Sequence, residues 1–168
     1  MKNYRNLFFL FLVFLLQLIL SDYVHLGPWI YVCLVPFLVL NIPLSRPPHV
    51  VMLIAFAIGI LLDILSDGAP GLNAFAAVMA AAPRRFFYRS IVNGDRQDKT
   101  EIVRIQDIGT VKYLKYLAAL TAVYMAAYIL LDCVSFRPLG FILVKFIAST
   151  AVCIALSLLL AIPFGNRN

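Results

Sequence analysis

Long runs of apolar residues alternate with short polar segments along this chain. Six runs can be drawn, at residues 7–23, 28–44, 50–65, 72–87, 113–131 and 139–162. The runs are continuous, whereas a membrane β-strand alternates apolar and polar residues over about ten positions. Because lipid cannot bond backbone polar groups, only helices or closed barrels cross a bilayer. The pattern therefore predicts an all-α integral membrane protein with six transmembrane helices, forming a single domain over residues 1–168.

The composition agrees with a lipid environment. Hydrophobic residues make up 63% of the chain and charged residues 13%, whereas an ordinary soluble domain carries about 25% charged residues. The mean hydropathy is +0.94. A soluble domain of this size could not bury so much apolar surface, so the class of soluble proteins is excluded.

Basic residues indicate which side of the membrane is cytoplasmic. If both termini are cytoplasmic, Arg137 lies outside and Lys145 lies within a helix, and every other Lys and Arg lies inside. This asymmetry is a strong orientation signal, because cytoplasmic loops are enriched in Lys and Arg. It also accounts for the net charge of +6, so we expect no nucleic-acid binding.

The longest polar segment is the predicted cytoplasmic loop, residues 88–112. Ile102, Ile105 and Ile108 recur in it at helical spacing. This spacing is typical of a short helix that lies on the membrane with its isoleucines toward lipid. A disordered loop is the alternative.

Carboxylates and chain-turning residues separate the third run from the fourth. They are Asp63, Ser66, Asp67, Pro70 and Gly71. Such groups are costly inside hydrocarbon without partners, so the two runs are expected to form a helical hairpin that turns at the outer surface. We expect Asp63 to cap or hydrogen-bond the backbone of the turn, and Pro70 and Gly71 to set its shape. A contact of Asp63 with a partner protein is the alternative.

Small and polar residues predict which helix faces are turned inward. In the fourth run, small side chains that allow a neighbouring backbone to approach closely share helical faces: Ala76, Ala77, Ala80 and Ala81. The fourth helix is therefore expected inside the bundle. In the sixth run, polar residues recur every four positions and predict a face toward the interior: Lys145, Ser149, Cys153 and Ser157.

Two charges fall within the predicted spans. Asp63 lies near the outer end of the third span, and Lys145 lies six residues into the sixth span from the same surface. A lysine side chain can extend toward the surface, so we expect Asp63 and Lys145 to form an intramembrane ion pair that offsets the cost of burial. Pairing with Asp132 and simple hydration are the alternatives.

The chain lacks the residue patterns of enzymes and metal sites. It has no paired carboxylates beside a nucleophile and base, and no glycine-rich phosphate loop. Cys33, Cys133 and Cys153 have no metal-ligand spacing, and His25 and His49 fall in predicted loops. We therefore expect neither catalysis nor a cofactor.

The central hairpin resembles that of the MreD family of bacterial rod-shape proteins. The shared pattern is a glycine, an aspartate four residues on, a serine three further on, and a proline and glycine ahead of the next helix: Gly59, Leu61, Leu62, Asp63, Ser66, Pro70 and Gly71. Chain length, six-span layout and the basic loop after the fourth span also fit. The chain departs from the family where Pro70 directly precedes Gly71 and where Asn73 replaces a frequent histidine.

This resemblance implies a multi-pass protein of the bacterial cytoplasmic (inner) membrane. MreD-like proteins are non-catalytic scaffold subunits of the cell-elongation machinery, which controls rod shape and peptidoglycan synthesis. They bind the single-span protein MreC and act alongside RodA, a class B penicillin-binding protein and, indirectly, MreB. Their fold is thought to be similar to that of the substrate-binding subunits of energy-coupling-factor transporters.

The alternative function is that of a membrane subunit that binds the substrate of a vitamin transporter. It would use the same six helices around an outward-facing pocket. The candidate lining residues are Trp29, Tyr124, Tyr128 and Lys145, since ligand pockets combine apolar walls with a few convergent polar groups. The alanine-rich fourth span would then meet a coupling partner.

Overall fold

A computed structural model describes residues 2–23, 31–66, 70–92, 103, 105–132 and 139–165. The described residues form helices and connecting turns, with no strand among them, which confirms the all-α class. The helices are α1 (Lys2–Tyr23), α2 (Val35–Leu40), α3 (Pro48–Leu65), α4 (Leu72–Ala81), α5 (Arg84–Val92), α6 (Ile105–Ile108), α7 (Thr110–Asp132) and α8 (Leu139–Gly165).

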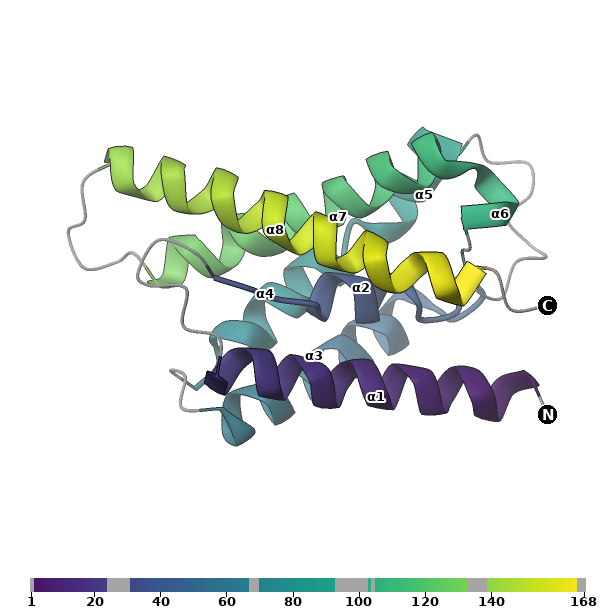
Figure 1. The fold of residues 1–168 in the computed structure, drawn as a ribbon, viewed down its shortest axis with the longest axis horizontal. Coiled ribbons are helices and arrows are strands. Elements are labelled where there is room, and N and C mark those ends of the chain that lie inside the picture. Colours follow the sequence, from purple (N-terminus) through teal and green to yellow (C-terminus); the bar gives the residue numbers. More distant parts are fainter. Residues whose placement is uncertain are drawn as a thin grey trace.

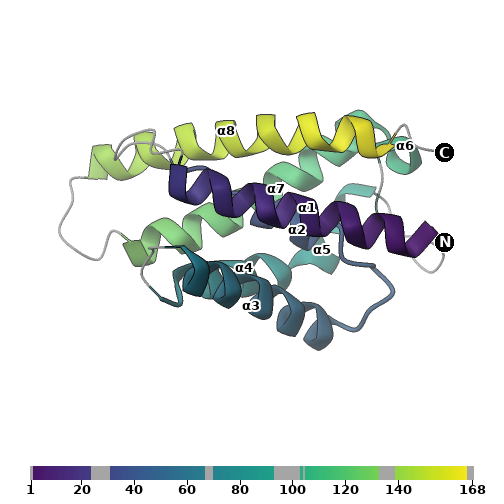
Figure 2. The same ribbon diagram turned by 60° about the horizontal axis from the view of Figure 1, so that its bottom comes forward.

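The long helices run lengthwise through the molecule (Figure 1). The start of α1 and the end of α8 lie at the same end, on the right of Figure 1. We call it the arginine end, because Arg46, Arg84 and Arg85 lie there. The opposite end, where α3 turns into α4 and where α7 finishes, is called the aspartate end after Asp63 and Asp132. Figure 2 shows α3 and α4 side by side as an antiparallel hairpin.

Three of the helices are long and apolar enough to cross a membrane. They cover Pro48–Leu65, Thr110–Asp132 and Gly140–Ala161, with 18, 23 and 22 residues, close to the ~20 residues that a bilayer core requires. The apolar parts of α1, Phe8–Ser21, and of α4, Leu72–Ala81, are shorter. The described residues therefore include apolar helices compatible with a membrane protein.

Two of the predicted spans are interrupted. The run at 28–44 contains the non-helical segment Tyr31–Leu34 and only six helical residues in α2, with Pro36 in its first turn. The run at 72–87 is broken at Ala82 and Pro83, where α4 ends and α5 begins in a new helix. Proline accounts for both interruptions, because it removes a backbone donor and clashes with the preceding turn; Pro36 and Pro43 lie in the first of these runs and Pro83 lies in the second.

Val103 and helix α6, which lie between α5 and α7, pack against the hydrophobic core. Val103 is 2% exposed, and the half-buried Ile105 and Ile108 of α6 pack against the hydrophobic core. The predicted short helix is therefore present at Ile105–Ile108, but the expected orientation of these isoleucines toward lipid was wrong. Ile102 lies outside the described residues.

The α3–α4 hairpin is closely packed at Gly59. A Cβ atom at Gly59 would lie 2.4 Å from Ala74 Cα and 2.7 Å from Ala74 N, so only glycine allows this approach of the two backbones. The small residues of α4 are buried, in agreement with the expected position inside the bundle: Ala76 0%, Ala77 0%, Ala80 0% and Ala81 4% exposed. This contact fixes the position of α4 and its first turn.

Candidate functional site

The Asp63 carboxylate binds the first turn of α4. Its side chain is 4% exposed. Oδ2 accepts hydrogen bonds from the backbone N–H groups of Gly71 (3.0 Å) and Ala74 (3.1 Å). Oδ1 accepts from the backbone N–H (3.1 Å) and the side-chain Nδ2 (2.9 Å) of Asn73. The carboxylate thus satisfies donors that a helix N-terminus leaves unpaired and places negative charge at the positive end of the helix dipole.

The turn itself supports this cap. Gly71 immediately precedes α4 with φ of 93°, a left-handed conformation that favours glycine. Ser66 follows α3, and its Oγ donates a hydrogen bond to the Leu62 carbonyl at 2.7 Å. This bond satisfies one of the last carbonyl groups of α3. Pro70 and Gly71 are exposed, and Asp67 lies outside the described residues.

Asn73 extends the cap into a polar network. Its Oδ1 accepts hydrogen bonds from the hydroxyls of Tyr31 (2.8 Å) and Tyr124 (2.5 Å). The rings of Tyr31 and Tyr128 are stacked with centroids 4.1 Å apart. Because Asn73 also donates to Asp63, one amide connects α3, α4, α7 and the segment before α2. The role of Asn73 was not expected from the sequence; its place two residues after Gly71 was the available signal.

Side chains of α1 and α8 bind the non-helical segment Tyr31–Leu34. The N–H groups of Tyr31, Cys33 and Leu34 donate to Ser149 Oγ (2.9 Å), Cys153 Sγ (3.1 Å) and Gln17 Oε1 (2.6 Å). Cys153 and Ser149 are fully buried, in agreement with the inward polar face expected for this helix. Non-helical backbone at membrane depth is tolerated where protein groups bond it. These side chains therefore make the interruption of the second run tolerable.

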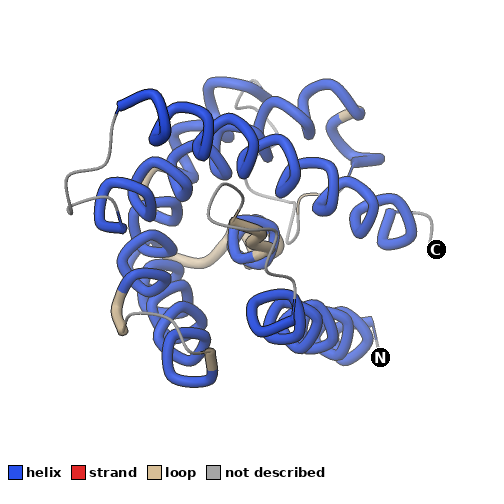
Figure 3. The backbone as a smooth tube through the Cα atoms, turned by 60° about the vertical axis from the view of Figure 1, so that its left-hand side comes forward, coloured by secondary structure: helices blue, strands red, loops and turns tan. Residues whose placement is uncertain are grey.

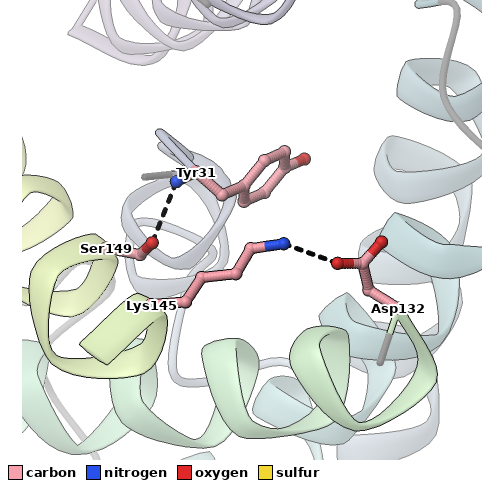
Figure 4. Close-up of polar contacts among 4 residues, drawn as sticks. All are labelled: Tyr31, Asp132, Lys145 and Ser149. Carbon is pink, nitrogen blue, oxygen red and sulfur yellow. Dashed lines mark hydrogen bonds and ion pairs between the residues drawn. The ribbon is translucent and has the colours of Figure 1, made fainter. Parts of the chain in front are cut away.

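Lys145 pairs with Asp132 rather than with Asp63 (Figure 4). Lys145 Nζ lies 2.5 Å from Asp132 Oδ2, with 11% of the lysine side chain and 33% of the aspartate side chain exposed. The predicted Asp63–Lys145 ion pair was therefore wrong. Both Asp63 oxygens are occupied by the first turn of α4, whereas Asp132 at the end of α7 lies opposite the first turns of α8.

Arg84 is buried at the opposite end, with 2% exposed. Its Nη2 donates to the Leu40 carbonyl at 3.1 Å and to the Ile42 carbonyl, and its Nε donates to the Tyr116 hydroxyl at 3.2 Å. These carbonyls lie at the C-terminal end of α2, where a cation is stabilised by the helix dipole. Arg85 donates to the carbonyls of Leu44 (3.4 Å) and Arg46 (3.1 Å). The two arginines hold the chain that connects α2 to α3.

An apolar groove of about 1100 Å³ lies between α1 and α3. Figure 3 shows α1, which begins at the point marked N, standing apart from the α3–α4 pair, with α2 between them. The walls are apolar side chains: Phe8, Phe11, Phe14, Ile54, Ala57 and Leu61. Asn41, Ile42 and Pro43 form part of its lining next to α2. Neither Asp63 nor the Pro70–Gly71 turn lines this groove.

The described residues suggested for a vitamin pocket are bonded to or stacked on other side chains of the protein. Tyr124 is fully buried and bonded to Asn73, Tyr128 stacks on Tyr31, and Lys145 pairs with Asp132. Trp29 lies outside the described residues. Among the residues that the structure describes, no group of three His, Cys, Asp or Glu side chains is placed to hold a metal ion.

We expect the two described cysteines to be protected from labelling. Cys33 and Cys153 are both 0% exposed and unpaired by a disulfide. In a Cys133→Ala background, a maleimide reagent should leave the folded protein unmodified and should label two thiols after denaturation. Mass spectrometry before and after unfolding measures this. Labelling of either thiol in the folded protein would contradict the packing of α8 on Tyr31–Leu34.

Comparison with protein-family models, with curated proteins and with solved structures finds no match to this chain. The class is therefore defined by the structure alone. It is a helical protein that contains apolar helices of membrane-spanning length. Its buried polar side chains form hydrogen bonds with the backbone of neighbouring helices and of the non-helical segment Tyr31–Leu34.

Proposed function

We propose that this protein is a non-catalytic scaffold subunit of the bacterial cell-elongation machinery, resembling MreD. It crosses the cytoplasmic membrane six times with both termini in the cytoplasm, and it binds an MreC-like single-span partner. Through that partner it helps to control peptidoglycan synthesis and cell shape together with RodA, a class B penicillin-binding protein and MreB.

The observation that supports this proposal is the hydrogen bonding of the Asp63 carboxylate. Both of its oxygens accept hydrogen bonds from the first turn of α4, so the most conspicuous acidic residue of the hairpin serves to join two helices. A general base or nucleophile needs a free position beside a substrate. The geometry of Asp63 favours a rigid frame over a reactive centre.

The positions of the chain ends also support the proposed topology. The start of α1 and the end of α8 lie at one end of the molecule (Figure 1), as an even number of crossings requires. Arg46, Arg84 and Arg85 lie at that same end, which is the basic side expected in the cytoplasm. In the proposed topology the remaining three crossings are α1, the interrupted segment around α2, and α4 together with α5.

We place the contact with the MreC-like partner at the aspartate end. The turn at Pro70 and Gly71 is exposed there and is held rigidly by Asp63, so it offers a preorganised surface. The transmembrane helix of the partner and its adjoining outer segment dock beside this turn. The polar network behind the turn keeps the docking surface in one shape.

Site-specific crosslinking tests this function. The full chain carrying Pro70→Cys in a Cys133→Ala background is co-expressed with an MreC-like protein and treated with a cysteine-reactive crosslinker. We expect the partner to co-purify and to crosslink at position 70. The matched control is His49→Cys, which is exposed at the arginine end and should give no crosslink. Absence of co-purification, or equal crosslinking at both positions, would contradict the proposal.

A further inference from the structure

We propose that the groove between α1 and α3 binds one anionic diacyl phospholipid, with its acyl chains between the helices and its phosphate at the arginine end. The volume of about 1100 Å³ exceeds the ~300–1,000 Å³ of ordinary small-ligand pockets. Asn41 is the one polar side chain that lines it among the described residues, and its Nδ2 is bonded to the Phe37 carbonyl. Such a lining accepts long hydrocarbon chains and offers little to a polar ligand.

The rim of the groove at the arginine end is basic. Ile42 and Pro43 line the groove, and the chain continues directly to Leu44 and Arg46. Arg84 donates to the Ile42 carbonyl and Arg85 to the carbonyls of Leu44 and Arg46. Two guanidinium groups thus contact the rim itself, and the Arg46 side chain is exposed beside them.

These cations are not neutralised by the acidic side chains that the structure describes. Asp63 and Asp132 both lie at the aspartate end, bonded to α4 and to Lys145. The guanidinium groups bond only neutral oxygens in the contacts given above, and Arg84 Nη1 is buried without a hydrogen-bond partner in the described part of the chain. Because Arg84 is 2% exposed, a phosphate at this rim would bind the accessible guanidinium groups of Arg85 and Arg46, and arginine binds phosphate well through its several donors.

The charge at the rim decides between a lipid and a partner helix. Single-span membrane proteins carry an excess of Lys and Arg at their cytoplasmic ends, so a partner helix in this groove would bring like charge to the arginines. An anionic phospholipid of the cytoplasmic leaflet brings the opposite charge, and juxtamembrane basic groups attract such lipids. The site is therefore separate from the partner contact at the aspartate end.

Native mass spectrometry of the full chain in detergent tests this site without any partner protein. The probes are palmitoyl-oleoyl phosphatidylglycerol and phosphatidylethanolamine with the same chains. We expect tighter binding of phosphatidylglycerol, and a loss of about fivefold for each cation removed in Arg46→Gln and in Arg85→Gln. The matched controls Lys112→Gln and Lys115→Gln remove exposed charges from the first two turns of α7 and should keep the preference.

A second variant separates the groove from the charges. Ala57 is a small residue of the groove wall, so Ala57→Phe should fill the space and abolish binding of both lipids. Ala151→Phe places the same ring on an exposed position of α8 and should leave binding unchanged. Thermal melting of each variant verifies that it folds, and this check makes the lipid result interpretable.

Three results would overturn the lipid site. They are equal binding of the two lipids by the unsubstituted chain, equal losses in the arginine and lysine variants, and retention of lipid by Ala57→Phe. If Ala57→Phe retains lipid but no longer co-purifies with the MreC-like protein, the groove belongs to the partner helix. Because the lipid titration contains no partner, its failure leaves the proposed scaffold function standing.

Discussion

Asp63→Ala is expected to prevent stable folding of the α3–α4 hairpin. The substitution leaves three buried donors without their acceptor, namely the backbone N–H groups of Asn73 and Ala74 and the side-chain Nδ2 of Asn73. Each unsatisfied buried donor costs about 1–3 kcal/mol, so we expect a loss of at least ~3 kcal/mol in the free energy of unfolding. The measurement is thermal unfolding in detergent, together with the amount of protein in the membrane.

Asp63→Asn removes the charge of the carboxylate and keeps the size of the side chain. An asparagine has one acceptor oxygen, and its amide NH₂ would face donors of the α4 turn, so this variant should also be strongly destabilised. The matched control is Asp132→Asn at the same end. One third of the Asp132 side chain is exposed, and an asparagine oxygen there can still accept a hydrogen bond from Lys145 Nζ, so this variant should be destabilised less than Asp63→Asn. If Asp63→Ala, Asp63→Asn and Asp132→Asn were equally stable, the capping role of Asp63 would be contradicted.

The same variants separate stability from partner binding. If Asp63→Ala folds but loses the MreC-like partner, Asp63 contacts the partner directly. If both the abundance of the protein and its co-purification with the partner are unchanged, the partner contact and the stabilising role both fail.

Gly59→Leu is expected to separate α3 from α4 and abolish the folded state. Even the first side-chain carbon would lie 2.4 Å from Ala74 Cα, and backbone atoms cannot move aside as a flexible side chain does. The cost should therefore exceed the ~1–3 kcal/mol of ordinary overpacking. Gly59→Ala should already lower the melting temperature. Size-exclusion chromatography and thermal unfolding in detergent measure both variants.

Gly140→Ala is the matched control for Gly59. It lies near the start of α8, and a Cβ atom there meets no atom within 4 Å. Since alanine favours a helix over glycine by about 1 kcal/mol, this variant should be neutral or slightly more stable. A Gly59→Leu protein that unfolds like Gly140→Ala would show that the two helices do not make the close contact described.

The contrast between Asp63 and Lys145 shows how far sequence spacing can be used. A carboxylate a few residues before a turn and a new helix has donors nearby in the chain, so a capping role follows from local distances. The partner of Lys145 depends on which helix ends meet in space. Two carboxylates at the same end were available, and depth alone could not choose between Asp63 and Asp132.

The run at 28–44 shows the same limit. Pro36 and Pro43 disfavour a continuous helix in this run, but hydropathy alone does not show where the backbone leaves the helical conformation. Tyr31–Leu34 is non-helical, and the N–H groups of Tyr31, Cys33 and Leu34 donate to side chains of Ser149, Cys153 and Gln17. These side chains come from positions 17 or more residues away from the N–H groups that they bond, and no local pattern brings them together.

By itself, the sequence determined the all-helical class, the hairpin at Asp63 and the inward faces of α4 and α8, because each depends on helical period, hydropathy or residues close along the chain. Only the tertiary structure decided which charges pair, that Asn73 joins Asp63 to two tyrosines, and that α1 stands apart from α3 to leave a groove with a basic rim. Those features depend on contacts between distant segments, which are set by how the helices pack.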